Sequence, residues 1–196
     1  RSFPGKEDGS LASMVAHTLT THILPQVDFG MDFHTGGASR TNFPQIRFEE
    51  GDNLAEEIAN TFAAPFTLNS PVIKGSFRET AKNMDKTVVV FEGGETLRID
   101  PKTVDEGIKG IKRVLHHFGM LAKAPMQQHK THYFKESHWV RAEVSGLFRH
   151  KKESGKKVKE GQTIGYISSP TNDYSVKVKS PYSGYIIGHN NFPLIH

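Results

Sequence analysis

Apolar side chains recur every three to four positions in three segments of the chain. The first segment runs from Ser10, a suitable N-cap, to Pro25, with apolar residues four apart at positions 11, 15, 19 and 23. This pattern predicts a helix of about four turns that packs through its apolar stripe. A second helix is predicted near positions 52–63, where residues 54, 58 and 62 are apolar and Pro65 follows.

The third helical segment is marked at both ends. Asp100 suits an N-cap, Pro101 suits the first helical position, and Gly119 suits the residue after the helix. Apolar residues at positions 104, 108, 111, 115 and 118 are four or three apart, and Lys and His occupy the last turn. We therefore predict a helix from Asp100 to Phe118.

Two segments between these helices have the composition of strands. The segment 27–34 places Phe29, Met31 and Phe33 on one face and is followed by Thr35-Gly36-Gly37, which we interpret as a glycine loop. The segment 87–91 is a continuous β-branched and aromatic run, typical of a strand buried on both faces. Strands alternating with helices predict an α/β sheet flanked by helices for residues 1–124.

The pattern changes after residue 124. Residues 125–136 show no periodicity and are predicted to be a linker, and residues 137–196 alternate short strands with Gly, Pro, Ser and Asn turns. The segment Val144–Phe148 recurs weakly as Tyr182–Ile186, which favours two related half-barrels. We expect 137–196 to form a small all-β domain of the barrel-sandwich type.

Composition narrows the chemistry more than it narrows the fold. The 196 residues carry 25 Lys+Arg and 21 Asp+Glu, a net charge of +4, and the basic residues are interspersed with acidic ones. A one-sided basic face is absent from this pattern, so nucleic acid is not an expected partner. Because the chain has no Cys, a disulfide framework and a thiolate zinc site are excluded. Candidate metal ligands must then be sought among the 11 His and the carboxylates. No apolar run approaches the ~20 residues of a membrane span.

Two strand ends carry candidate chemistry. In Asp32-Phe33-His34, the carboxylate and the imidazole share a face, an arrangement that can fix the tautomer of a metal ligand. The alternative is a core His that is hydrogen-bonded at a strand end. Glu92 follows an apolar strand, where an ionised carboxylate requires compensation for its desolvation. The alternative for Glu92 is a side chain that turns outward into solvent.

Other basic and imidazole residues are weaker candidates. Arg40 and Arg47 flank the glycine loop and could contact an anionic substrate, whereas Arg78 and Arg98 are interpreted as surface charges. The histidines near the predicted linker are expected to be solvated, with a surface metal site as the alternative; they are His129, His132 and His138.

Three segments in order resemble the succinylglutamate desuccinylase/aspartoacylase family of the zinc carboxypeptidase superfamily. They are Arg1-Ser2-Phe3-Pro4-Gly5, Asp32-Phe33-His34-Thr35-Gly36-Gly37 and Phe91-Glu92-Gly93-Gly94. The resemblance implies that Arg1 holds the substrate carboxylate, that His34 is the third zinc ligand, and that Glu92 is the catalytic glutamate. It also implies Zn²⁺ as the cofactor and a small N-acyl compound as the substrate.

The family's first two zinc ligands come from a His-x-x-Glu motif upstream of the Arg segment, and this sequence, which starts with the Arg segment, shows no such motif ahead of it. The chain starts at Arg1 and stops at His196 in what reads as mid-strand, so we expect a piece of a longer enzyme. Because a catalytic zinc usually has three protein ligands, we expect this chain alone neither to hold zinc tightly nor to hydrolyse amides.

The resemblance implies hydrolysis of an amide bond in an N-acyl amino acid or a related small compound. Zinc would lower the pKa of a bound water toward ~7, and Glu92 would take the water proton and deliver it to the leaving amine. Two alternatives stay open: a metallocarboxypeptidase that cuts peptides, and a binding protein that has lost its zinc site. The family favours a cytoplasmic protein with no membrane partner, and a homo-oligomer is an open alternative.

The last third of the chain carries a second resemblance. Segments 145–148, 157–162 and 180–184 are similar to the barrel-sandwich hybrid of biotinyl and lipoyl carriers. The hairpin around Lys177 lacks the carrier's usual lysine context, so an accessory barrel is expected rather than a modified carrier.

Overall fold

The two segments with the clearest helical period form helices close to their predicted bounds. They are α2 (Asn53–Phe62) and α4 (Pro101–His117) in the computed structural model, which describes residues 2–171 and 173–196. Asp52 caps α2 by accepting a hydrogen bond from the Ala55 N–H at 2.9 Å. Asp100 likewise accepts from the Lys102 N–H at 3.1 Å, so the predicted start of the third helix is confirmed.

The described residues form two compact units. The first contains residues 2–33, 45–91 and 106–136, and the second contains 34–44, 92–105 and most of 137–196. The main sheet has the strand order β1-β4-β2-β3-β5, and β11 pairs with β2. Its strands are β1 (Phe29–Gly36), β2 (Arg40–Phe48), β3 (Phe66–Asn69), β4 (Thr87–Glu95), β5 (His132–Phe134) and β11 (Gly188–Asn190).

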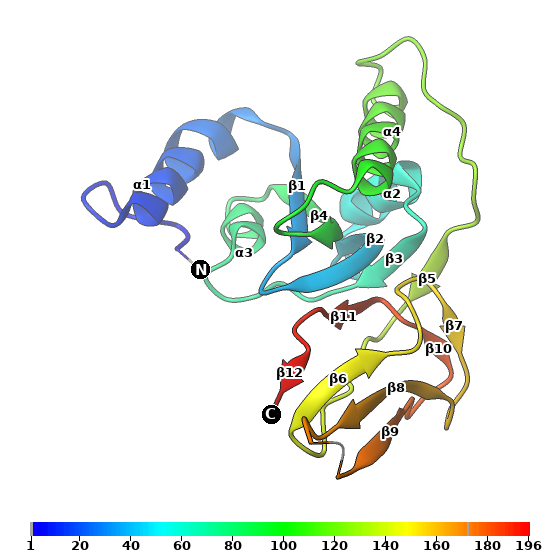
Figure 1. Ribbon diagram of the computed structural model, residues 1–196. Helices are drawn as coiled ribbons and strands as arrows, with labels where there is room; N and C mark the ends of the chain where they lie inside the picture. Colours follow the sequence, from blue (N-terminus) through cyan, green and yellow to red (C-terminus); the bar gives the residue numbers. More distant parts are fainter. Residues whose placement is uncertain (1, 172) are drawn as a thin grey trace. The chain divides into compact units, whose positions relative to one another are not determined.

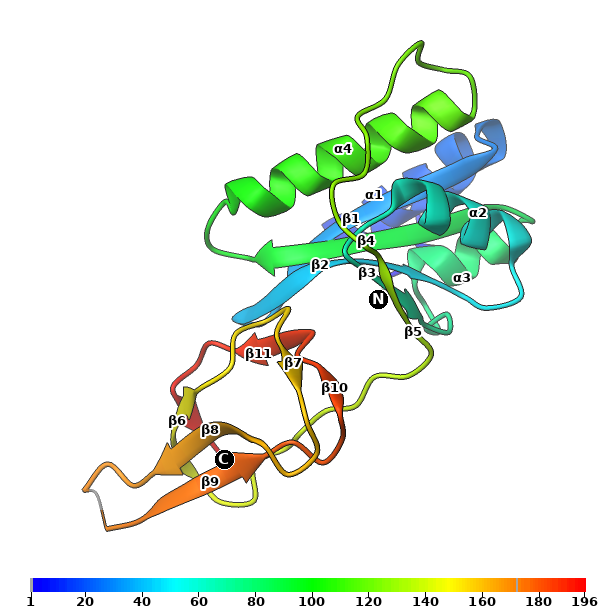
Figure 2. The same cartoon turned by 90° about the vertical axis from the view of Figure 1, so that its right-hand side faces the viewer.

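In the first unit, helices cover both faces of the sheet (Figure 1). On one face, α2 and α4 enclose the main core, which contains Ile46, Phe62, Val89 and Val114. On the other face, α3 (Phe77–Lys82) and the helical segment that ends at Gln26 enclose a smaller core around Leu24, Ala81 and Val88. Figure 2 shows α4 lying along β4. The predicted α/β architecture with a helix-flanked sheet is therefore confirmed for this part of the chain.

The close packing of α4 depends on glycine. A Cβ on Gly110 would lie 2.2 Å from Cε1 of Phe62, whose side chain is fully buried, whereas a Cβ on Gly107 would have ordinary contacts of 3.4 Å and more. The predicted apolar stripe is confirmed in its second half, where Ile111 and Phe118 pack against the main core, whereas Val104 and Ile108 are 48% and 45% exposed. The small residues of α4 allow the aromatic rings of the core to reach the helix backbone.

The first predicted helix is also helical in the structure but packs differently. It consists of α1 (Leu11–Thr18), a π-helical turn (Leu19–Ile23) and a 3₁₀ turn (Leu24–Gln26), with Ser10 as the N-cap. The predicted stripe is largely exposed, with Leu11 at 78% and Val15 at 52%, while Ala16 and Leu24 are buried. None of the described helices is long and apolar enough to cross a membrane.

Several elements differ from the sequence expectation. The strand predicted for 87–91 continues through Glu92 to Glu95, and the glycine loop is a tight connection between β1 and β2. The predicted linker 125–136 contains β5, which pairs in parallel with β3. β2, β3 and α3 had no corresponding prediction. They are short, or, as at Pro44 in β2, interrupted by a residue that weakens a strand pattern.

The second unit contains the C-terminal strands. They form a four-stranded sheet in the order β12-β6-β8-β9 and a two-stranded sheet of β10 and β7. The bounds are β6 (Gly146–His150), β7 (Lys157–Val158), β8 (Thr163–Ser168), β9 (Ser175–Lys179), β10 (Gly184–Tyr185) and β12 (Leu194–Ile195). The two glycines of the weak repeat, Gly146 and Gly184, each begin a strand.

The two helical glycines of α4 make a matched test of this packing. Gly110→Ala should lower the free energy of unfolding by about 1–3 kcal/mol, because the added methyl group overlaps the Phe62 ring. Gly107→Ala should be neutral or stabilising by up to about 1 kcal/mol, because alanine has the higher helix propensity and the space exists. Urea denaturation of both variants measures the difference, and equal stabilities would show that α4 is not held by this contact.

Candidate functional site

The aromatic pair Phe33 and Phe91 determines which strand residues face the candidate site. Their ring centroids are 5.5 Å apart, and both rings approach Phe62 in the main core, at 6.3 and 5.1 Å. Successive side chains on a strand point to opposite faces. His34 and Glu92, each next in sequence to one of these rings, therefore face away from the main core, on the same face of two adjacent strands.

His34 and Glu92 belong to the same compact unit. His34 is exposed near the end of β1, whereas Glu92 is half-buried within β4. The expectation that Glu92 follows the strand is wrong by a few residues, because Gly93 and Gly94 continue the ladder. The juxtaposition of the two polar residues at one end of the sheet stays a prediction.

The glycine after His34 is required by packing rather than by ligand access. A Cβ on Gly36 would lie 2.2 Å from the Arg40 carbonyl oxygen and 3.0 Å from that of Gly94. The Gly36 carbonyl also accepts a hydrogen bond from the Thr96 hydroxyl at 2.6 Å. Gly37, by contrast, has open space around it. Gly36 therefore lets the ends of the strands that carry His34 and Glu92 pack closely.

Asp32 lies on the same face of β1 as His34, two residues earlier. In the first unit it acts electrostatically on Arg78, a residue of α3. Burial lowers the pKa of the Arg78 guanidinium, and the positive charge of Arg47 lowers it further. The carboxylates of Glu49 and Asp32 act in the opposite direction and raise this pKa. Carboxylates and guanidinium groups are thus gathered on this side of the sheet.

The interpretation of Arg78 as a surface charge is wrong. Its residue is only 8% exposed, and its Nη2 donates hydrogen bonds of 2.8 Å to the carbonyl oxygens of Ser70 and Pro71. Nη1 is buried without a hydrogen-bond partner. A buried, positioned guanidinium with an unused donor is suited to binding a carboxylate. The sequence signal was Ser76 followed by Glu79, a capping-box pattern that marks the start of α3.

Gln45 is a second residue that sequence reasoning missed. Its neighbours Ile46 and Phe48 face the main core, which places Gln45 and Arg47 on the opposite face of β2. Gln45 is fully buried, and both polar atoms of its side chain lack a hydrogen-bond partner. An amide in this state is costly unless it serves a ligand.

The other candidates have separate surroundings. The Arg40 guanidinium lies 4.9 Å from the ring of Trp139. His129 contacts Glu106 at 3.1 Å, His132 stacks on Phe134, and His138 lies against Tyr182. Within 2–171 and 173–196, no three His, Asp or Glu side chains are placed to hold a metal ion. Arg1, the predicted carboxylate-binding residue, lies outside the described residues.

Comparison with known proteins matches the part of the chain that contains the three motif segments. Residues 1–118 match the model of the succinylglutamate desuccinylase/aspartoacylase catalytic domain. An N-alpha-acetyl-L-2,4-diaminobutyric acid deacetylase of Halomonas elongata is 25% identical over 182 residues, which are 87% of this chain and 53% of that protein.

Several solved structures match over the whole chain, including the following two. The product-bound ectoine utilization protein EutE (DoeB) of Ruegeria pomeroyi is 25% identical with a TM-score of 0.88. A succinylglutamate desuccinylase of Silicibacter sp. TM1040 is 26% identical with a TM-score of 0.87. The chain spans 63% of each of these two structures and about half of the curated relative.

The two glycines after His34 predict opposite responses to substitution. Gly36→Ala should lower the free energy of unfolding by about 2 kcal/mol or more, because its methyl group meets the carbonyl oxygen of Arg40 and backbone atoms cannot give way as a side chain can. Gly37→Ala should change stability by less than about 1 kcal/mol. Thermal and urea unfolding measure both, and a stable Gly36→Ala variant would contradict the close packing of these strand ends.

Proposed function

The chain belongs to the succinylglutamate desuccinylase/aspartoacylase family, and we propose that it forms part of a hydrolase that cleaves the amide bond of an N-acyl amino acid or a related small N-acyl compound. The observation that carries the proposal is the placement of His34 and Glu92 on one face of adjacent strands, within the two family motifs. The names of the relatives, a deacetylase and a desuccinylase, support N-acyl amino acids over peptides as substrates.

Glu92 has the proton-transfer role in this proposal. It is half-buried in a strand whose flanking residues Phe91 and Gly93 are buried. A carboxylate held in a strand at a fixed position can act as a base toward a nearby water molecule. Glu92 accepts the proton of the attacking water and returns it to the nitrogen of the leaving amine.

Arg78 anchors the substrate carboxylate in this proposal. Two carbonyl groups fix one nitrogen of its guanidinium, and the other is buried and available. Because the group is held in place before substrate arrives, little entropy is lost when a carboxylate binds. Arg1 remains a second carboxylate ligand on the strength of its motif alone.

Zinc is our proposed cofactor, with His34 as one ligand. The described residues do not fit a complete zinc site, because no three His, Asp or Glu side chains among them converge. The remaining ligands would have to come from residues outside this chain. We also propose that 137–196 forms an accessory barrel-like domain, and that the enzyme acts in the cytoplasm, on family resemblance alone.

Glu92→Gln should test the proton-transfer role in the active enzyme. The amide side chain keeps the shape but cannot accept a proton, so kcat should fall by about 10²–10⁴-fold while zinc content is unchanged. Steady-state kinetics on a panel of N-acyl amino acids, with elemental analysis for zinc, measures both. Glu160→Gln, in an exposed turn, is the matched control. A kcat near that of the wild type would overturn the assignment.

Arg78→Lys should test the carboxylate anchor. Lysine keeps the charge but lacks the planar fork, so KM for a carboxylate substrate should rise about tenfold or more. The wild-type enzyme should prefer the carboxylate substrate to its carboxamide analogue, and the variant should lose this preference. Arg98→Lys, at an exposed guanidinium paired with Glu95, is the control. A variant that retains the preference would show that Arg78 is only structural.

A further inference from the structure

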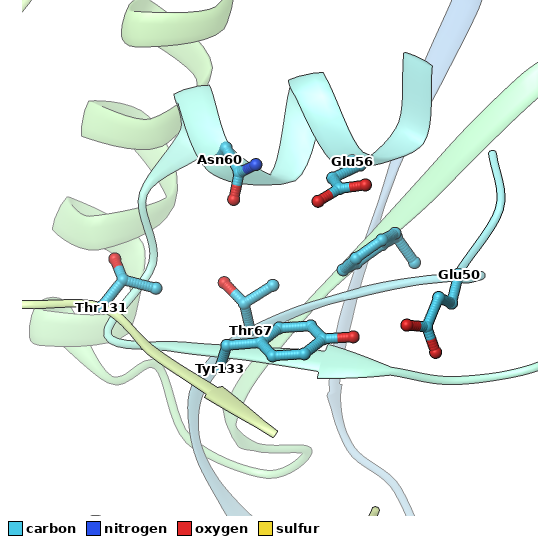
Figure 3. Close-up of a pocket in the computed structure, with 7 residues that line it drawn as sticks. Glu50, Glu56, Asn60, Thr67, Thr131 and Tyr133 are labelled. Carbon is cyan, nitrogen blue, oxygen red and sulfur yellow. The ribbon is translucent and has the colours of Figure 1, made fainter. Parts of the chain in front are cut away.

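The first unit contains a pocket on the face of the sheet that α2 covers. Its volume is about 180 Å³, less than the ~300–1,000 Å³ of sites for drug-sized ligands, so any occupant is small. Figure 3 shows Glu56 and Asn60 projecting from α2 toward the strands, opposite Thr67 and Tyr133. Asp32 points to the other face of the sheet, so this pocket is separate from the candidate site.

The charge of the pocket is negative. Glu50, in the turn after β2, and Glu56, in α2, both line it. Desolvation raises the pKa of the Tyr133 hydroxyl, and the carboxylates of Glu50 and Glu56 raise it further. Both carboxylates therefore act on the same hydroxyl group at the pocket wall. Such a field favours a cation over an anion or a neutral ligand.

Thr67 provides an independent indication of a ligand. Its residue is 1% exposed, and its hydroxyl oxygen is buried without a hydrogen-bond partner. Figure 3 shows this side chain pointing into the pocket, toward Asn60. A buried hydroxyl without a partner carries a desolvation cost that a donor in the pocket would remove.

The pocket also has an aromatic wall. The rings of Phe48 and Tyr133 are 6.1 Å apart at their centroids and inclined at 42°. Aromatic rings attract organic cations through their negative faces. Divalent metal ions instead require several closely converging oxygen ligands, and the described residues include no such group of three acidic or imidazole side chains.

We propose that this pocket binds a small organic cation with N–H donors, a primary ammonium or guanidinium group. The carboxylates of Glu50 and Glu56 neutralise its charge, the Thr67 hydroxyl and the Asn60 amide oxygen accept its hydrogen bonds, and the aromatic pair contacts its apolar part. This binding is distinct from amide hydrolysis and does not use His34, Glu92 or Arg78.

The test is a nuclear magnetic resonance titration of the isotope-labelled chain with methylguanidinium chloride at constant ionic strength. Saturable shifts with a millimolar dissociation constant should be confined to backbone amides near residues 48–50, 56–60, 67 and 131–133. N-methylurea, which has the same shape without the charge, should produce no saturable shifts. Absence of saturation with methylguanidinium, or equal shifts with both compounds, would overturn the proposal.

Three variants separate a specific site from a general charge effect. Glu56→Gln should weaken binding about threefold or more, since it removes one partly solvated charge. Thr67→Val should weaken binding while leaving the fold intact, because the hydroxyl it removes has no partner in the protein. Glu57→Gln changes the same charge one residue away, where the side chain faces His117, and should leave affinity nearly unchanged. Equal effects of Glu56→Gln and Glu57→Gln would reject the site.

Discussion

The candidate site depends on one packing contact. In it, the rings of Phe33, Phe62 and Phe91 touch one another and the glycine face of α4. These rings lie 5.1–6.3 Å apart, and Phe62 fills the space that a side chain on Gly110 would need. Phe33 and Phe91 lie on adjacent strands and point toward the main core. The residue that follows each of them must therefore point to the opposite face of the sheet. The aromatic core therefore determines that His34 and Glu92 share a face, although neither residue takes part in it.

The opposite face carries charged and amide groups beside its smaller apolar core. Arg78 is held there by two carbonyl groups, with Glu49 and Asp32 favouring its charged form. Gln45 adds a buried amide without a partner. Burying such groups lowers stability unless a bound polar ligand compensates. Positioned polar groups of this kind are what a site for a polar ligand requires, and the main core on the other face offsets their desolvation cost.

The sequence predicted helices correctly where a hydrophobic periodicity over several turns was accompanied by a capping residue at the start of the helix. The helices after Asp52 and Asp100 each had a capping carboxylate and a regular apolar stripe, and both formed. It failed for β3, β5 and α3, which are too short to show a period, and it therefore left Arg78 outside any element. On α4 the stripe found Ile111 and Phe118, which pack against the main core, but it did not show the close approach of Phe62 to Gly110, because the stripe rule counts only large apolar residues.

Strand alternation explains how one sheet can present two different chemistries. Ile46 and Phe48 belong to the main core, while Gln45 and Arg47 face the other way. Alternate residues of the same strand therefore form the two faces of the sheet. At β3 and β5, polar side chains replace the apolar ones on the face of the sheet that carries the main core. Thr67 and Tyr133, paired in register, line the same pocket as Glu56 of α2. A cation there and a carboxylate near Arg78 would occupy opposite sides of the sheet, so each could be occupied without competing for the same side chains.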